Sequence, residues 1–235
     1  MTDREFDAVS PRLAVPDVAN FRDAGVAGLR PGLIYRSGAL NSLTPEGARH
    51  LARLGIRTVI DLRTTAERTV WPDLHHGLEL EALHHPLLPD HGDDFSWPKT
   101  MADTYRVMAE TGGPSIAATV RRLAAPDGLP TLIHCAVGKD RTGLTIAVLQ
   151  SLAGLGQAEV VADFLSSNRH LGLDAGPVYY IDEQGERRRS HPVEATYLDL
   201  ALTHLHTAHG SLDTFLTTHG VTPTELTTLR ENLRP

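Results

Sequence analysis

The apolar positions of the chain fall into short runs that alternate with longer, helix-like stretches. Three short runs are typical of buried strands, at Leu33–Arg36, Thr58–Ile60 and Thr131–Ile133. A fourth candidate strand spans Leu80–Leu88. Because helical stretches separate these runs, the pattern predicts an α/β fold. Its centre should be a mostly parallel sheet of four to five strands flanked by helices.

Capping residues and prolines mark the ends of the predicted helices. Thr44-Pro45 combines an N-cap with a proline at the first helical position, and Gly55 stands where that helix should end. Thr64 to Glu67 has the spacing of a capping box, so a short helix is expected there. Two further helices are predicted between Thr100 and Ala125. Others are predicted from Leu144 to Leu152, from Gln157 to about Asn168, and from Pro192 onwards.

The composition is that of an ordinary globular protein, with 235 residues, 41% hydrophobic and 22% charged. We expect one domain over residues 1–235, with a core at about 13–168 and a helical tail at about 192–235. The 22 basic and 29 acidic residues give a net charge of −7. This balance argues against a nucleic-acid partner but is compatible with a local basic pocket.

The amino terminus carries no recognisable targeting segment. Its first ten residues are charged and lack the apolar region of a signal peptide. No stretch of the chain approaches the ~18 apolar residues of a membrane helix. We therefore expect a cytoplasmic protein without an integral membrane segment, leaving open export by a route that needs no signal peptide. The oligomeric state is also left open.

Cysteine and lysine are scarce. Cys135 is the only cysteine, which excludes an internal disulfide and a Cys₄ or Cys₂His₂ zinc site. The thirteen histidines form no HExxH motif, so neither a metal nor another cofactor is expected. Lys99 and Lys139 are the only lysines. One of these two lysines lies within five residues of the cysteine.

That neighbourhood is a ten-residue segment that follows a predicted strand and opens a predicted helix. Successive backbone N–H groups in such a loop can surround one tetrahedral anion, and the helix N-terminus adds partial positive charge. The same field favours a thiolate at Cys135. The guanidinium of Arg141 matches two oxygens of a phosphate. The segment reads His134-Cys135-Ala136-Val137-Gly138-Lys139-Asp140-Arg141-Thr142-Gly143.

This segment resembles the HCx5R[S/T] signature of the cysteine-dependent phosphatases. Its form HCxxGKDRTG resembles, more narrowly, the atypical bacterial tyrosine and lipid phosphatases. Three upstream stretches, at residues 20–25, 35–38 and 61–63, are similar to other motifs of that family. The resemblance extends from about Leu13 to Asn168, with a weaker match around Gly210 to Leu233. It implies the cysteine-phosphatase fold.

The resemblance also implies a two-step hydrolysis of phosphomonoesters. The Cys135 thiolate would attack phosphorus, and water would then hydrolyse the phosphocysteine. Arg141 would bind the phosphate together with the loop residues Ala136, Val137, Gly138, Lys139 and Thr142. In this scheme the Thr142 hydroxyl hydrogen-bonds the sulfur and helps it leave, and His134 orients the loop from behind. The expected substrates are phosphotyrosine, with phosphoserine, phosphothreonine and phosphoinositides as further classes.

Three aspartates compete for the role of general acid, which protonates the leaving oxygen. Asp140 is placed first, because the resembling family is thought to keep its acid inside the cradle. Asp90 is second; it begins an expected loop from Pro89 to Lys99 that is similar to the acid loop of dual-specificity enzymes. Asp73 lies in a Trp-Pro-Asp triplet that resembles the acid-loop motif of the conventional tyrosine phosphatases. It lies 62 residues before the cysteine, and we interpret the match as a coincidence.

Several basic residues admit two readings. Lys139 either meets a second phosphate of an inositol ring or only strengthens the positive potential. Arg22 and Arg36 either rim the pocket or form a structural ion pair. The Arg187–Arg189 run is expected to be a solvated loop rather than a membrane contact. The pair in Asp61-Leu62-Arg63 is expected to brace the core beneath the loop.

Two other functions use similar local patterns. A rhodanese-like sulfurtransferase also presents a cysteine loop between a strand and a helix, but it needs no terminal Arg-Thr pair. A catalytically silent phosphate-binding module would commonly lack the cysteine, the arginine or the acid, and all three are present. A nucleotide-binding GxxxxGK[ST] loop is excluded, since Ile133 and Asp140 occupy its required Gly and Ser/Thr positions.

Overall fold

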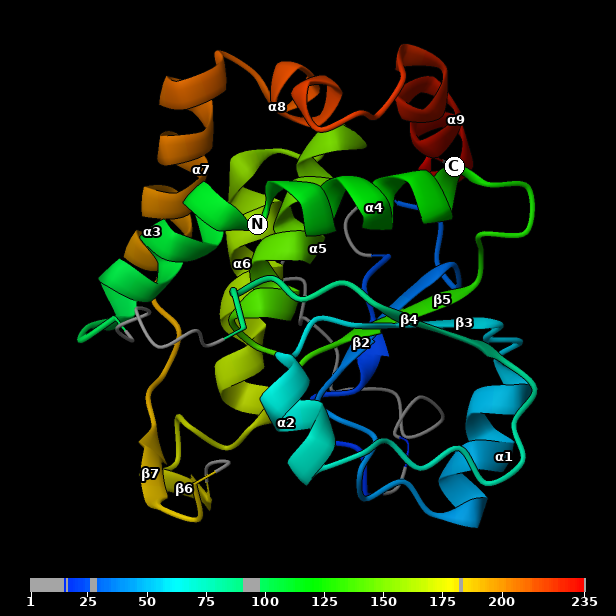
Figure 1. The fold of residues 1–235 in the computed structure, drawn as a ribbon, viewed down its shortest axis with the longest axis vertical. Coiled ribbons are helices and arrows are strands. Elements are labelled where there is room, and N and C mark those ends of the chain that lie inside the picture. Colours follow the sequence, from blue (N-terminus) through cyan, green and yellow to red (C-terminus); the bar gives the residue numbers. More distant parts are fainter. Residues whose placement is uncertain (1–14, 16, 26–28, 91–97, 182–183, 235) are drawn as a thin grey trace, which may run out of the picture.

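The centre of the structure is a five-stranded sheet (Figure 1). The computed structural model describes residues 15, 17–25, 29–90, 98–181 and 184–234. The strand order is β1-β2-β5-β3-β4, with β1 antiparallel to β2 and all other pairs parallel. The predicted sheet is thus confirmed. The strands are β1 (Arg22–Asp23), β2 (Ile34–Ser37), β3 (Thr58–Asp61), β4 (Glu81–His84) and β5 (Thr131–His134).

Helices cover both faces of this sheet, as Figure 1 shows. Successive residues of the central strand β5 point to opposite faces of the sheet and belong to two separate hydrophobic cores. Leu132 packs on the side of α1, and Ile133 packs on the side of α4 and α5. The C-terminal helices extend the second core, where α7 packs on α3 and α9 on α4. The helices are α1 (Pro45–Arg53), α2 (Thr65–Val70), α3 (Met101–Thr111), α4 (Gly113–Ala124), α5 (Arg141–Leu152), α6 (Gln157–His170), α7 (Ala195–His209), α8 (Leu212–Thr218) and α9 (Pro223–Leu233).

The capping signals mark these helices well. The Thr44 side chain accepts a hydrogen bond at the start of α1, and Thr64 and Glu67 form a complete capping box at α2. The helix predicted from Leu144 begins earlier, at Arg141, because Leu144 N–H already donates to the Asp140 carbonyl at 2.8 Å. The first turn of α5 therefore adjoins the cysteine loop directly.

One element differs from the sequence-based expectation. The Arg187–Arg189 run is not a loop but most of β7 (Arg187–Ser190), which pairs antiparallel with β6 (Val178–Ile181) in a separate hairpin. Three consecutive arginines hide the alternation of polar and apolar residues that would have indicated a strand.

One expected boundary also changed, and one expected loop lies mostly outside the described residues. The strand expected over Leu80–Leu88 is confined to β4, because Pro86 follows soon after it. Most of the expected loop, residues 91–97, lies outside the described residues. Within the described ranges, no helix is long and apolar enough to cross a membrane.

Candidate active site

The cysteine loop, residues 135–140, connects the central strand β5 to α5. In the sheet, β5 lies between β2 and β3. Cys135 is 2% exposed, and the backbone N–H of Gly138 donates to its Sγ at 3.3 Å. The loop forms the floor of a pocket of about 490 Å³. The predicted site residues that line this pocket are Cys135, Ala136, Val137, Lys139, Asp140 and Arg141.

Gly138 allows the loop to lie against the end of β2. Its φ is +75°, and a Cβ at this position would lie 2.3 Å from the carbonyl group of Ser37. No side chain therefore fits there. The Gly138 carbonyl accepts hydrogen bonds from Asn20 Nδ2 at 2.7 Å and from Arg36 at 3.0 Å. These contacts fix the loop from behind.

Arg22 and Arg36 form a buried ion-pair network rather than a pocket rim. Asp163 on α6 lies 3.2 Å from Arg22 and 2.9 Å from Arg36, and Ser167 also accepts from both. Burial and the neighbouring Arg36 lower the pKa of Arg22 to about 9, although Asp163 opposes this. Neither arginine lines the pocket. The sequence left open whether these arginines rim the pocket or form a structural ion pair, and the structure favours the ion pair.

Arg141 is oriented by Glu67, a residue that the sequence indicated only as a helix cap. The two terminal nitrogens of Arg141 donate hydrogen bonds of 2.5 and 2.7 Å to the two carboxylate oxygens of Glu67. Burial acts to raise the pKa of Glu67, but the charge and hydrogen bonds of Arg141 outweigh it, and the pKa falls to about 2. Burial also opposes the charge of Arg141, yet Glu67 raises the pKa of that guanidinium above its usual value. The pair stays ionised.

Two donors hold the carboxylate of Asp140 in the pocket wall. The Tyr105 hydroxyl donates to Oδ1 at 2.9 Å, and Lys139 Nζ donates to Oδ2 at 2.7 Å. Tyr105 is fully buried on α3 and stacks on Tyr197 of α7. Burial and the nearby Asp140 charge raise the pKa of Tyr105 well above its usual value, so its hydroxyl remains a donor. Neither tyrosine was identified from the sequence.

The other two candidate acids are engaged elsewhere. The Asp90 carboxylate accepts from the Thr65 backbone N–H and from the Thr65 hydroxyl, both at 2.6 Å, at the start of α2. Asp73 accepts from the Leu40 N–H at 2.9 Å and contacts Arg63 at 2.9 Å. Neither aspartate lines the pocket that contains Cys135.

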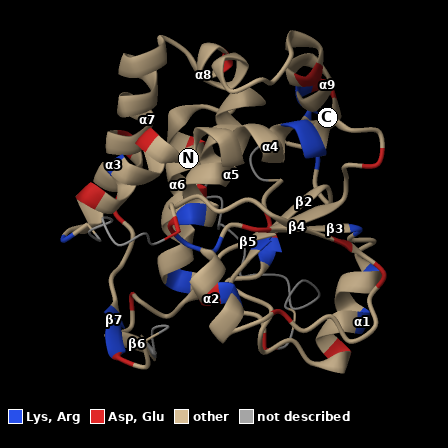
Figure 2. Cartoon of the chain, viewed as in Figure 1, with Lys and Arg blue, Asp and Glu red and all other residues tan. Residues whose placement is uncertain are grey.

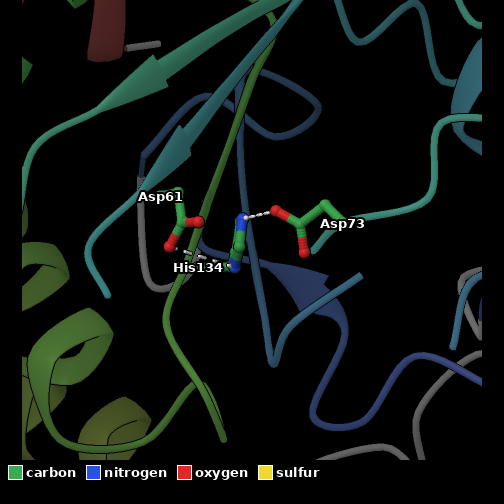
Figure 3. A group of neighbouring side chains, drawn as sticks. All are labelled: Asp61, Asp73 and His134. Atoms are coloured by element: carbon green, nitrogen blue, oxygen red, sulfur yellow. Dashed lines mark ion pairs between the residues drawn. The ribbon is translucent and has the colours of Figure 1, made fainter. Parts of the chain in front are cut away.

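His134 lies behind the loop between Asp61 and Asp73 (Figure 3). Its Nε2 lies 3.1 Å from Asp73 and its Nδ1 3.9 Å from Asp61. The three side chains could form a metal ligand set, but Arg63 already contacts both carboxylates, at 2.7 and 2.9 Å. Burial acts to raise the pKa of Asp73, but His134 and Arg63 outweigh this effect, so the pKa of Asp73 lies below its usual value. We therefore interpret the cluster as support for the loop.

Thr142 is the second residue of α5 and follows Arg141 directly. Its Oγ1 is buried and has no hydrogen-bond partner in the described part of the chain. A hydrogen bond to the cysteine sulfur, as the family resemblance implied, is not formed in this structure. The hydroxyl therefore has capacity for a partner that arrives with substrate.

Comparisons with known proteins identify the family of this chain. A sequence model of the tyrosine phosphatase family matches residues 13–235. Triple specificity protein phosphatase PtpB of Mycobacterium tuberculosis is 33% identical over 190 residues, covering 66% of this chain and 68% of that protein. A putative tyrosine-protein phosphatase of Cupriavidus necator is 27% identical over 234 residues, covering 87% of this chain and 82% of that protein.

A solved structure gives a weaker likeness. The crystal structure of TpbA from P. aeruginosa is 18% identical, with 76% of this chain and 98% of that chain covered and a TM-score of 0.39. The family match, in contrast, covers nearly the whole sequence and includes every pocket residue predicted from the cysteine loop. This chain therefore belongs to the tyrosine phosphatase family and is a protein-tyrosine or dual-specificity phosphatase.

Proposed function

We propose that this protein hydrolyses phosphomonoesters through a phosphocysteine on Cys135. The thiolate attacks phosphorus and forms the S–P bond, while the P–O bond to the leaving group breaks. Asp140 gives its proton to the departing oxygen. Water then attacks phosphorus, Asp140 takes a proton from that water, and the S–P bond breaks to release inorganic phosphate and the thiolate.

The observation that carries this proposal is the convergence of Cys135 and Arg141 on one pocket. The sulfur lies at the pocket floor beneath the N-terminus of α5, where the helix dipole and the Gly138 N–H favour negative charge. Glu67 holds the Arg141 guanidinium in a fixed orientation, so this group is preorganised before substrate binds. A phosphoryl group above the sulfur would meet both.

Asp140 is favoured over Asp90 as the acid because it lines the same pocket as the cysteine. Asp90 already accepts two hydrogen bonds from Thr65. Tyr105 can retain its hydrogen bond to Asp140 Oδ1 while Oδ2 exchanges a proton. In the resting structure Oδ2 accepts a hydrogen bond from Lys139 as a carboxylate. Asp140 must therefore release Lys139 and take up a proton from solvent before it can act as the acid.

Phosphotyrosine is the proposed principal substrate. Apolar side chains line the pocket beside the polar loop and suit an aromatic ring: Leu88, Met101 and Met108. Phosphoserine, phosphothreonine and phosphoinositides are kept as further substrates, in keeping with the name of the triple specificity relative. Because Lys139 bonds Asp140, its proposed role is to strengthen the positive potential of the pocket rather than to meet a second ring phosphate.

The test is Cys135→Ser on an aryl phosphate. The variant should lose hydrolysis by a factor of about 10⁴ or more while still binding phosphate or a non-hydrolysable analogue. Undiminished turnover would contradict the covalent mechanism. Sulfur transfer from thiosulfate to cyanide by the wild-type protein would instead favour the rhodanese-like alternative. Binding without turnover by the wild type would favour a silent module. The cytoplasmic location stays a prediction.

A further inference from the structure

The pocket has a second wall that no residue of the cysteine loop supplies. The β6–β7 hairpin and the residues after it contribute Tyr180, Gln184, Arg188, Arg189, Ser190 and His191 to the same pocket as Cys135. Figure 2 shows the basic residues gathered along β7. A protein with a net charge of −7 therefore places two further arginines at its catalytic pocket.

Two adjacent arginines of this hairpin have different surroundings. Arg188 lies opposite Tyr180 in the register, and both line the pocket. Arg187 lies opposite Ile181, and its guanidinium stacks at 3.9 Å over the ring of Tyr179. Arg187 does not line the pocket, whereas Arg188 and Arg189 do. Arg188 is thus a cation in the pocket, and Arg187 is a neighbouring cation outside it that can serve as a control.

The position of these arginines fits an anion that lies away from the scissile phosphate. Arg188 and Arg189 are exposed, so they lie at the pocket mouth, whereas Cys135 is buried at its floor. Closer to the sulfur, Lys139 and Arg141 are the basic residues of the phosphate cradle. The arginines of the hairpin are therefore cations added at the entrance, beyond those of the phosphate cradle.

We propose that Arg188 and Arg189 form a second anion subsite for phosphopeptides with an acidic side chain beside the phosphotyrosine. This inference rests on the proposed function. A phosphotyrosine whose phosphate reaches the pocket floor leaves its backbone at the mouth, where flanking side chains meet the hairpin. Carboxylates bind guanidinium groups with matched geometry, and opposite charge at the mouth also accelerates the encounter.

The experiment compares two phosphotyrosine peptides of equal length, one with glutamates flanking the phosphotyrosine and one with glutamines. The measured quantity is the ratio of their kcat/KM values, taken within each variant so that differences in active fraction cancel. We expect the wild-type protein to prefer the acidic peptide by about three- to tenfold at low salt. The ratio should fall toward one in the Arg188→Gln/Arg189→Gln double variant and stay at the wild-type value in Arg187→Gln.

Three results would overturn the subsite. They are a wild-type ratio near one, a preference that survives the double variant, and an equal loss in Arg187→Gln. An inositol bisphosphate and its monophosphate serve as a second probe pair. A dependence on Arg188 and Arg189 that appears only for the bisphosphate would contradict the peptide assignment.

A binding measurement separates this inference from the proposed function. Fluorescence anisotropy with labelled acidic and neutral peptides is measured on Cys135→Ser protein, with and without the two hairpin substitutions. Preferential binding that depends on the arginines, together with no wild-type turnover, would support the subsite and contradict the phosphatase mechanism. Wild-type turnover with equal binding of both peptides would contradict the subsite alone.

Discussion

Glu67 binds Arg141 through both carboxylate oxygens while it also closes the capping box of α2 with Thr64. The same side chain therefore begins a helix and orients the phosphate-binding arginine. These two roles respond differently to substitution, because glutamine can serve in a capping box but carries no charge.

Glu67→Gln should lower kcat/KM for an aryl phosphate by about ten- to a hundredfold, since a misplaced guanidinium no longer matches the phosphate. Thr64→Ala is the matched control. It weakens the cap, at a cost of about 1 kcal/mol in stability, and leaves the ion pair intact. Steady-state kinetics and urea unfolding of both variants separate the roles. Equal losses of activity would show that helix α2, and not the charge, positions Arg141.

The Glu67 carboxyl should also make stability depend on pH. Its pKa is about 2 in the folded protein and near 4.5 when unfolded, so its contribution is complete above pH 4.5 and is lost as the pH falls toward 2. By pH 3.5 the protonation of this single group should cost on the order of 1 kcal/mol of stability. Urea unfolding at pH 6 and 3.5 measures the loss. The loss should be smaller in Glu67→Gln, and an identical loss in both proteins would contradict the assignment.

Substitution of the two candidate acids should separate their roles. Asp140→Asn is expected to reduce kcat by about 10²- to 10³-fold for a phosphate ester with a poor, alkoxide-like leaving group, and far less for p-nitrophenyl phosphate. Asp90→Asn should affect both substrates equally and weakly, because Asp90 caps α2 through Thr65. A stronger leaving-group dependence for Asp90→Asn than for Asp140→Asn would reverse the assignment.

Gly138→Ala should abolish most of the activity, because the added Cβ would collide with the carbonyl of Ser37 and displace the loop. Gly77→Ala is the matched control: Gly77 has φ +78°, yet no atom lies within 4 Å of its hypothetical Cβ. The control should lose about 1 kcal/mol of stability from backbone strain alone and keep its turnover. Turnover and thermal unfolding of both variants check this. An active Gly138→Ala protein would show that the loop tolerates displacement.

The sequence predicted the sheet well because its signals are local. The short apolar runs of β2, β3 and β5 are buried on both faces, and a parallel central strand needs no alternation. Capping boxes specify helix starts for a similar reason, since every atom involved lies within four residues. The cysteine loop was recognisable because its chemistry is contiguous in sequence. The division of the chain into a core and a tail stays a prediction.

The partners of that loop could not be predicted, because they lie far from it along the chain. Tyr105 reaches Asp140 from α3, 35 residues away, and an isolated tyrosine on an amphipathic helix is typical of a core residue. Glu67 satisfied a local pattern so completely that it gave no hint of a second role. Only the folded chain brings these groups together.

The residues behind Gly138 have a consequence for the order in which the protein is made. Arg36 leaves the ribosome early, but its partner Asp163 follows 127 residues later. At a synthesis rate of about 5–20 residues per second, the cysteine emerges seconds before the ion pair that supports its loop. A nascent chain that ends before α6 therefore lacks the carboxylate that holds Arg36 against the Gly138 carbonyl, and we expect newly made protein to become active only once α6 has folded.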